Sequence, residues 1–403
     1  MFASRSIQRI VCICLFGTTG LAICQTKADL IAERQAALTL EQQGKLDAAE
    51  AAWRSLSKAV PSNPEPYARL GLLEARQEHY KEAVPLYRKA LALDPKKPEL
   101  KMNLGLALFK GGEMKQAVEV FTSLRKSTPA GSPEVQRLDV LIGMSYYGLA
   151  LYSNAVPLLK AAAQRDQQNS PLLLALAHSC LWSNQLQCVM DAYHQILALN
   201  AESAEADMLA GEALDQMQDS DGAIKMFREA VAANPKEPDV HFGLGYLLWT
   251  QKRYPDALLQ FQAELENDPN HAQSLVYLGD SYLQLNNPSD ALAPLQKGLA
   301  LDPSLWIASL DLGIIDSDAG RNDDALRELR KALALKPTEV NVHWRLARLL
   351  RTMGRTEEAK VEFEKAKTLN KTAADDLHKQ IANGSRQNRD NSQTPQTMAA
   401  PAQ

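Results

Sequence analysis

The sequence predicts an all-α fold, a solenoid of antiparallel helix pairs, and three observations carry that prediction. The segment "RKALALDP" at 88–95 returns as "QKGLALDP" at 296–303 and as "RKALALKP" at 330–337, so Pro303 and Pro337 mark one period. That period is about 34 residues, a length typical of helical repeats, and glycine and alanine recur with it. Only 6% of the residues are aromatic, and no long run alternates apolar with polar residues, so the composition favours helix over sheet.

The repeat is clearest in its small residues. Steps of one period, with one slip of four after Gly105, meet glycine or alanine each time: Ala37, Gly71, Gly105, Gly143, Ala177, Gly211, Gly245, Gly279, Gly313 and Ala347. Twelve residues later stands an alanine, with Val189 as the exception: Ala49, Ala83, Ala117, Ala155, Ala223, Ala257, Ala291, Ala325 and Ala359. Four residues further on, the side chain is large and apolar: Trp53, Tyr87, Phe121, Leu159, Tyr193, Phe227, Phe261, Leu295, Leu329 and Phe363.

The spacing within one unit predicts two antiparallel helices. The small residue and the alanine flank a short polar turn, such as "AGRNDDA" at 319–325. Because antiparallel helices approach closely only where facing side chains are small, we expect each small residue to face its alanine. The large residue shares the alanine's helical face and would fill the next gap. In most units a proline eight residues later ends the second helix, because proline lacks the N–H group.

A single helix pair cannot bury its apolar face, but a stack of pairs can. We expect a solenoid over residues 25–373, with about ten units starting near residues 30, 64, 98, 136, 170, 204, 238, 272, 306 and 340. The slip falls at 127–134, where either the loop is longer or the next helix starts a turn early. Residues 374–382 predict a capping helix with Leu377 and Ile381 on one side, and residues 383–403 have too little to bury and should be disordered.

This pattern resembles the tetratricopeptide repeat, whose signature is W-x2-L-G-x2-Y, then A-x3-F, then P over about 34 residues. The second unit matches it closely with Tyr67, Leu70, Gly71, Ala83, Tyr87, Ala90 and Pro95. The resemblance implies a right-handed superhelix whose first helices line a concave groove. It also implies a role in binding other proteins rather than in chemistry.

Residues 1–24 have the features of a secretory signal peptide. Two arginines precede a short apolar stretch without acidic residues, and Ala22 and Cys24 suit positions −3 and −1 of a cleavage site. We therefore expect an exported protein, periplasmic or extracellular, whose mature chain begins at Gln25 and has no membrane span. Two alternatives stay open: an uncleaved anchor, and a lipoprotein attached through Cys24, although Ile23 stands where a lipoprotein signal prefers a small residue.

The chain carries no recognisable catalytic, phosphate-binding or metal-binding motif. It lacks a glycine-rich phosphate loop, H-E-x-x-H and G-x-S-x-G, and no two of its seven histidines lie three or four residues apart. We therefore expect a binding protein rather than an enzyme, without cofactor or metal. Its net charge of −4 gives no basic surface for a nucleic acid. Cys180 and Cys188 fall on the two helices of one pair, and both a disulfide and two buried thiols are compatible with that placement.

The resemblance also implies where a partner binds, because it places certain first-helix residues in the groove. These residues are Met144, Tyr147, His178, Leu181, Trp182, Glu212, Asp215, Phe242, Tyr246, Trp249 and Asp280, with further acids at Glu205, Asp239 and Asp318. Phe242, Tyr246 and Trp249 share one short helix, which is more aromatic surface than packing between units usually needs. Packing alone remains the alternative for each of them.

The expected partner is a protein or peptide. An extended segment that pairs apolar anchors with lysine or arginine suits an aromatic surface ringed by acids. By analogy, such a scaffold would serve envelope assembly, for example secretion, pilus or polysaccharide machinery. A glycan-binding groove of polysaccharide export and the repeat arm of an enzyme complex are the two alternatives.

Overall fold

The computed structural model describes residues 27–199 and 203–372. The predicted signal peptide, capping helix and disordered tail lie outside the described residues. The chain divides into two compact units, residues 1–201 and 202–403. Within the described ranges every regular element is a helix, which confirms the all-α solenoid of helix pairs.

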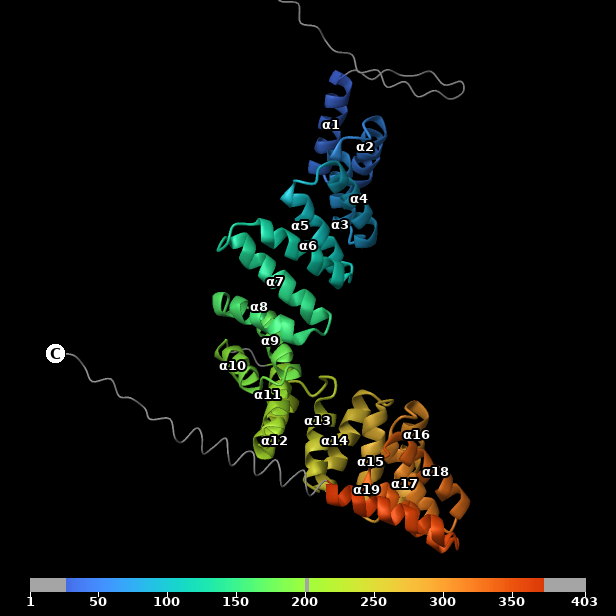
Figure 1. The fold of residues 1–403 in the computed structure, drawn as a ribbon. Helices are drawn as coiled ribbons and strands as arrows, with labels where there is room; N and C mark the ends of the chain where they lie inside the picture. The colour runs from blue at the N-terminus through green and yellow to red at the C-terminus, as the bar shows by residue number, and fades with distance from the viewer. Residues whose placement is uncertain (1–26, 200–202, 373–403) are drawn as a thin grey trace, which may run out of the picture. The chain divides into compact units, whose positions relative to one another are not determined.

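The first unit is a stack of helix pairs in which consecutive helices pack against each other (Figure 1). Within residues 27–199 the pairs are α1 (Lys27–Gln42) with α2 (Leu46–Ala59), α3 (Pro64–Arg76) with α4 (Tyr80–Leu93), α5 (Pro98–Lys110) with α6 (Met114–Ser127), α7 (Pro133–Gly148) with α8 (Tyr152–Arg165), and α9 (Ser170–Trp182) with α10 (Leu186–Ala198).

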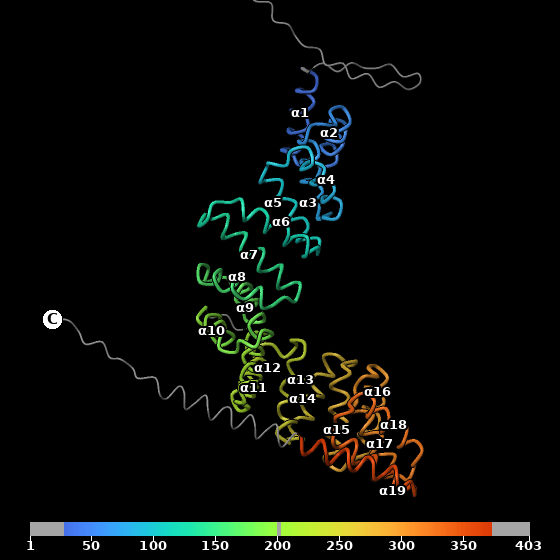
Figure 2. The backbone as a smooth tube through the Cα atoms, viewed as in Figure 1, coloured from blue at the N-terminus to red at the C-terminus, as the bar shows by residue number. Residues whose placement is uncertain are grey.

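The second unit repeats this arrangement. Its helices are α11 (Ala204–Gln216) with α12 (Ser220–Ala233), α13 (Val240–Thr250) with α14 (Tyr254–Asn267), α15 (Ala272–Gln284) with α16 (Pro288–Leu301), α17 (Trp306–Asp318) with α18 (Asn322–Leu335), and α19 (Val340–Thr352) with a helical run over residues 356–372. The backbone tube shows each pair as two antiparallel helices joined by a short turn (Figure 2).

Each turn within a pair contains one residue in the left-handed conformation. These residues are Gly44, Glu78, Gly112, Ala150, Asn184, Gln218, Lys252, Asn286, Gly320 and Gly354, with φ between 55° and 80°. The backbone N–H of the residue directly after the left-handed one donates to the carbonyl oxygen five residues earlier in the chain, as Arg253 N does to Leu248 O at 2.9 Å. This is the Schellman arrangement, which satisfies the last carbonyls of the first helix and reverses the chain.

The pair core adds a contact to the expected one between small residue and alanine. The alanines are buried, and the alanine carbonyl lies close to the glycine in some pairs, as at Gly279, where an added Cβ would lie 3.1 Å from Ala291 O. The atoms nearest to each glycine of the repeat position, however, belong to the large residue sixteen positions later, as for Gly71 with Tyr87. A Cβ added at Gly245 would lie 2.7 Å from Phe261 Cε1. The reason is that helical side chains lean toward the helix N-terminus, so the large side chain reaches back over the alanine's turn and fills the space at the glycine.

The slip of four residues adds three residues to the start of α7 and one residue to the loop before it. α6 ends at Ser127, and α7 begins at Pro133 and is 16 residues long, whereas α5 and α9 have 13 residues each. The Ser132 side chain accepts a hydrogen bond from Val135 N at 3.3 Å and caps the new start. The early helix start therefore accounts for most of the slip, and a loop longer by one residue accounts for the rest.

Candidate functional site

In the first unit the candidate residues make separate contacts and do not form one continuous surface. The rings of Tyr147 on α7 and His178 on α9 lie 6.0 Å apart, and Met144 lies half-buried one turn before Tyr147. Trp182, at the end of α9, is 67% exposed and stacks on Tyr152 at the start of α8, with 6.2 Å between ring centroids.

Leu181 and the two cysteines belong to the interior of the α9–α10 pair. The prediction that Leu181 lines the groove is wrong, because this side chain is only 4% exposed. After the first residue of α9, the side chains that are not buried, Pro171, Leu174, His178 and Trp182, share one helical face, and Leu181 lies off that face among the buried residues. Cys180 and Cys188 are joined by a disulfide that links the two helices, with 5.8 Å between their Cα atoms.

In the second unit the aromatic residues form one connected cluster. Along α13, ring centroids lie 6.2 Å apart between Phe242 and Tyr246 and 6.1 Å apart between Tyr246 and Trp249. Tyr277 of α15 contacts all three rings, at 6.0, 5.5 and 5.0 Å. Burial raises the pKa of Tyr277 to about 12, so its hydroxyl remains neutral. Tyr277 is not among the site residues predicted from the sequence. What could have pointed to it is that it is an aromatic residue in the middle of α15, the first helix of the following pair.

Asp280 fixes Trp249 instead of adding charge to a surface. Trp249 Nε1 donates to Asp280 Oδ2 at 2.5 Å, and Gln284 Nε2 donates to Asp280 Oδ1 at 3.1 Å. The prediction that Asp280 contributes negative charge to the groove is wrong, since it is 4% exposed and burial raises the pKa of its carboxyl group. Its side chain interacts with the buried Asp311 of α17, because this position of α15 faces the next pair.

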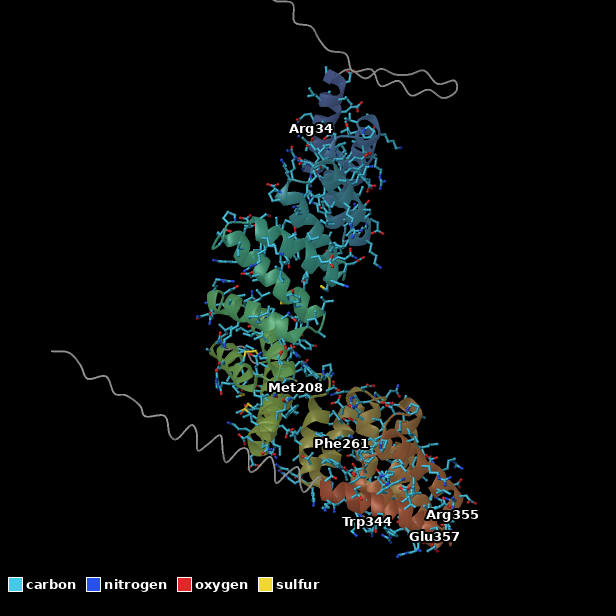
Figure 3. The ribbon with its side chains drawn as sticks, in the orientation of Figure 1. Arg34, Met208, Phe261, Trp344, Arg355 and Glu357 are labelled. Atoms are coloured by element: carbon cyan, nitrogen blue, oxygen red, sulfur yellow. A yellow bond between two sulfur atoms is a disulfide. The ribbon has the colours of Figure 1, made fainter. Side chains whose placement is uncertain are left out.

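A pocket of about 410 Å³ opens between α11 and α13 beside the aromatic cluster. It is lined by Met208, Glu212, Asp215, Gln216, Phe227, Asp239, Phe242, Gly243, Tyr246, Leu247 and Gln273. Two acids of α11, Glu212 and Asp215, therefore meet two aromatic rings of α13, and both acids are exposed. Met208, labelled in Figure 3 with Phe261, packs against the hydrophobic cluster below the pocket.

The start of α13 is held from α14 by Glu264. α13 begins at Val240, two residues later than the repeat spacing predicts, because Asp239 takes the left-handed conformation with φ of 64°. The Glu264 carboxylate accepts from the backbone N–H groups of Asp239, His241 and Phe242 at 3.0–3.3 Å. Glu264 is only 2% exposed, and these N–H groups with the helix dipole compensate its charge. This contact holds Asp239 at the rim of the pocket.

Two family models of the tetratricopeptide repeat match the sequence. One matches residues 34–98, 208–272 and 242–305, and the other matches 74–139 and 317–380, which together make up about two-thirds of the chain. The chain belongs to the tetratricopeptide repeat family. α11, α13 and α15 are the first helices of three consecutive repeats. The pocket and the aromatic cluster therefore both lie between first helices of neighbouring tetratricopeptide repeats.

Individual relatives are distant. The chain is 25% identical to the BBSome complex member BBS4 of Bos taurus over 228 residues, which is 57% of this chain and 43% of that protein. It is 24% identical to Tetratricopeptide repeat protein 1 of Schizosaccharomyces pombe over 217 residues, 50% of this chain and 20% of that protein. The chain thus spans less than half the length of either relative. Among solved structures, the APC/C hetero-tetramer Cut9–Hcn1 is similar, with 19% identity, a TM-score of 0.47, and coverage of 76% of this chain and 60% of that one.

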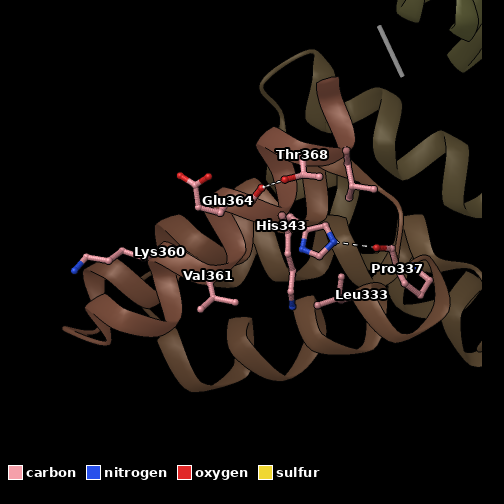
Figure 4. A pocket seen from close by; sticks show the side chains of 9 residues that line it. Leu333, Pro337, His343, Lys360, Val361, Glu364 and Thr368 are labelled. Atoms are coloured by element: carbon pink, nitrogen blue, oxygen red, sulfur yellow. Dashed lines mark hydrogen bonds between the residues drawn. The ribbon is translucent and has the colours of Figure 1, made fainter. Parts of the chain in front are cut away.

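A second hollow, of about 830 Å³, lies on the last described helix. His343 is buried at its edge, with Nδ1 2.5 Å from Glu362 Oε2. Its Nε2 lies 2.9 Å from Pro337 O (Figure 4). Apolar side chains such as Leu333 and Val361 line it. In earlier pairs the second helix is covered by the first helix of the next pair, so this hollow is the end surface of the described stack.

Within residues 27–199 and 203–372, none of the helices combines the length and the apolar character that a membrane span requires. In the same ranges, no group of three or more His, Cys, Asp or Glu side chains is placed to hold a metal ion.

Proposed function

We propose that this protein is a protein–protein interaction scaffold that binds an extended segment of a partner in its second unit. The binding surface consists of the α11–α13 pocket and the exposed edges of the aromatic cluster beside it. The observation that carries the proposal is the meeting of Tyr246, which is 36% exposed, with a pocket that Glu212 and Asp215 line from the facing helix.

The cluster is built so that its aromatic side chains are held in place before a partner arrives. Trp249 is held by its hydrogen bond to Asp280, and its ring meets Tyr277 edge-on at an interplanar angle of 78°. Tyr246 meets the same Tyr277 at 85° and stacks on Trp249. Rigid aromatic side chains lose little conformational entropy on binding, and for this reason they carry a large share of interface energy.

We further propose that about ten repeats make up the scaffold and that it acts outside the cytoplasm, in envelope assembly or secretion. Residues 1–24 support the location, with their basic start, apolar stretch and small residues at the cleavage site. Fusing residues 1–30 to a reporter enzyme tests this part alone. Retention of the reporter in the cytoplasm would overturn the proposed location and leave the binding surface untouched.

Site-specific photo-crosslinking in cells tests the binding surface. A benzophenone amino acid replaces Tyr246 in one variant and Leu259 in another, because Leu259 is 62% exposed on α14 and does not line the pocket. We expect a defined protein adduct from position 246 and none of the same mass from position 259. Adding Trp249→Ala should reduce that adduct at least tenfold, since loss of an aromatic anchor costs about 2 kcal/mol or more. Equal adducts at both positions, or none at 246, would overturn the proposal.

A further inference from the structure

We infer that the α11–α13 pocket selects an arginine side chain of the partner segment. This inference rests on the proposed function, because it assigns the chemistry of the residue that enters the pocket. It is carried by the acidic side chains that line the pocket, by the contacts that hold Asp239 in place, and by the aromatic faces available for stacking.

The pocket is lined by three carboxylates and no basic residue. Glu212 and Asp215 lie one turn apart on α11, and Asp239 lies on the opposite side, just before α13. None of the side chains that line the pocket is lysine or arginine. A cationic group that enters is therefore attracted from two sides, whereas an acidic segment would be repelled.

The histidine next to Asp239 is oriented as a donor to that acid. His271 Nδ1 accepts a hydrogen bond from the backbone N–H of Ser274 at 3.1 Å and lies 2.7 Å from the Ser274 hydroxyl. Because Nδ1 accepts, Nε2 is the nitrogen that donates to Asp239 Oδ1, at 2.9 Å. The Asp239 carboxylate is therefore the acceptor in this contact, and no lysine or arginine of the pocket lining pairs with it.

The amino end of α13 offers no competing anion site. Its backbone N–H groups, which would otherwise attract a phosphate or carboxylate, already bind the buried carboxylate of Glu264. The same contact fixes Asp239 in its left-handed conformation, so this carboxylate is positioned before a ligand arrives.

Arginine fits this lining better than lysine. Phe242 and Tyr246 line the pocket together with the acids, and a planar guanidinium can stack on their rings while it donates to carboxylate oxygens on either side. A lysine ammonium is a compact charge and uses only part of this geometry. The volume of about 410 Å³ admits an extended side chain with a neighbouring residue of the segment.

Selection from a displayed library of random twelve-residue peptides tests the inference with the full chain as bait. We expect the enriched peptides to share one arginine beside an apolar residue. For the best peptide, replacing that arginine with citrulline keeps the shape and removes the charge, and it should weaken binding at least tenfold, as expected for a charge-assisted contact. Replacing it with lysine should weaken binding less than citrulline does.

Matched variants place the effect in the pocket. Glu212→Gln together with Asp215→Asn should lose most of the preference for arginine over citrulline. Glu229→Gln, an exposed acid of α12 paired with Lys225 at 3.8 Å, changes charge in the same unit outside the pocket and should retain the preference. Peptides enriched without a basic residue, but lost with Trp249→Ala, would overturn the arginine inference and leave the proposed function standing. A library that yields no binder sensitive to Trp249→Ala would overturn both.

Discussion

Gly245→Leu tests the contact that sets the spacing of the α13–α14 pair. Gly245 is buried on α13, and a Cβ atom there would lie 2.7 Å from Phe261 Cε1, 2.9 Å from Phe261 Cδ1 and 3.2 Å from Gln260 Cβ. Phe261 has 0% exposure, so its ring has no solvent space into which it could move. Any side chain at position 245 must therefore push the two helices apart or displace the ring.

The size of the effect follows from two opposing terms. Alanine gains about 1 kcal/mol over glycine in helix propensity, while overpacking a filled core costs about 1–3 kcal/mol. Gly245→Ala should therefore lie between neutral and a loss of about 2 kcal/mol. Leucine adds three more carbon atoms at the same point, and we expect a loss of about 3 kcal/mol or more. For a unit of this size, that corresponds to a melting temperature lower by about 6–12 °C.

Thermal unfolding followed by far-ultraviolet circular dichroism measures the change. Gly148→Ala is the control, because its Cβ would meet only Met114 at 3.4 Å, an ordinary contact with a flexible side chain. We expect no loss of stability for that variant. A wild-type melting curve for Gly245→Leu would refute the packing derived for the pair.

The other predictions concern a buried acid, a turn and the disulfide. Burial and the neighbouring carboxylate hold the pKa of Asp311 well above its usual range, so its charged form destabilises the fold. Wild-type stability should therefore rise as pH falls from 8 toward 5; Asp311→Asn should be the more stable form at pH 8, and this advantage should shrink at pH 5. Lys252 has φ of 60°, so Lys252→Gly should stabilise by about 0.5 kcal/mol and Gly320→Lys, at φ of 72°, should destabilise, as judged from urea midpoints. Protein cleaved before Gln25 should show no reactive thiol until reduction frees Cys180 and Cys188, and two thiols without reductant would contradict the bond.

The candidate site was only partly predictable from the sequence. Helical periodicity places Phe242, Tyr246 and Trp249 on one helix face. The register of the repeat places Glu212 on the first helix of the preceding repeat. Those two patterns are local or periodic, so a single sequence contains them. Whether an acid at such a position meets solvent or another repeat depends on the neighbouring helix, and for that reason Asp280 was assigned to the wrong environment.

The sequence by itself determined the helix pairs of the described chain. Glycine, alanine and a large residue at fixed spacing encode a helix hairpin, and repeating that spacing leaves stacking as the way to bury each apolar face. Only the tertiary structure decided which residue fills the space at each glycine, how Glu264 clamps the start of α13, and that Tyr277 joins three rings of another repeat. These contacts depend on side-chain direction and on helix crossing geometry, and neither quantity is written in the order of residues along one helix.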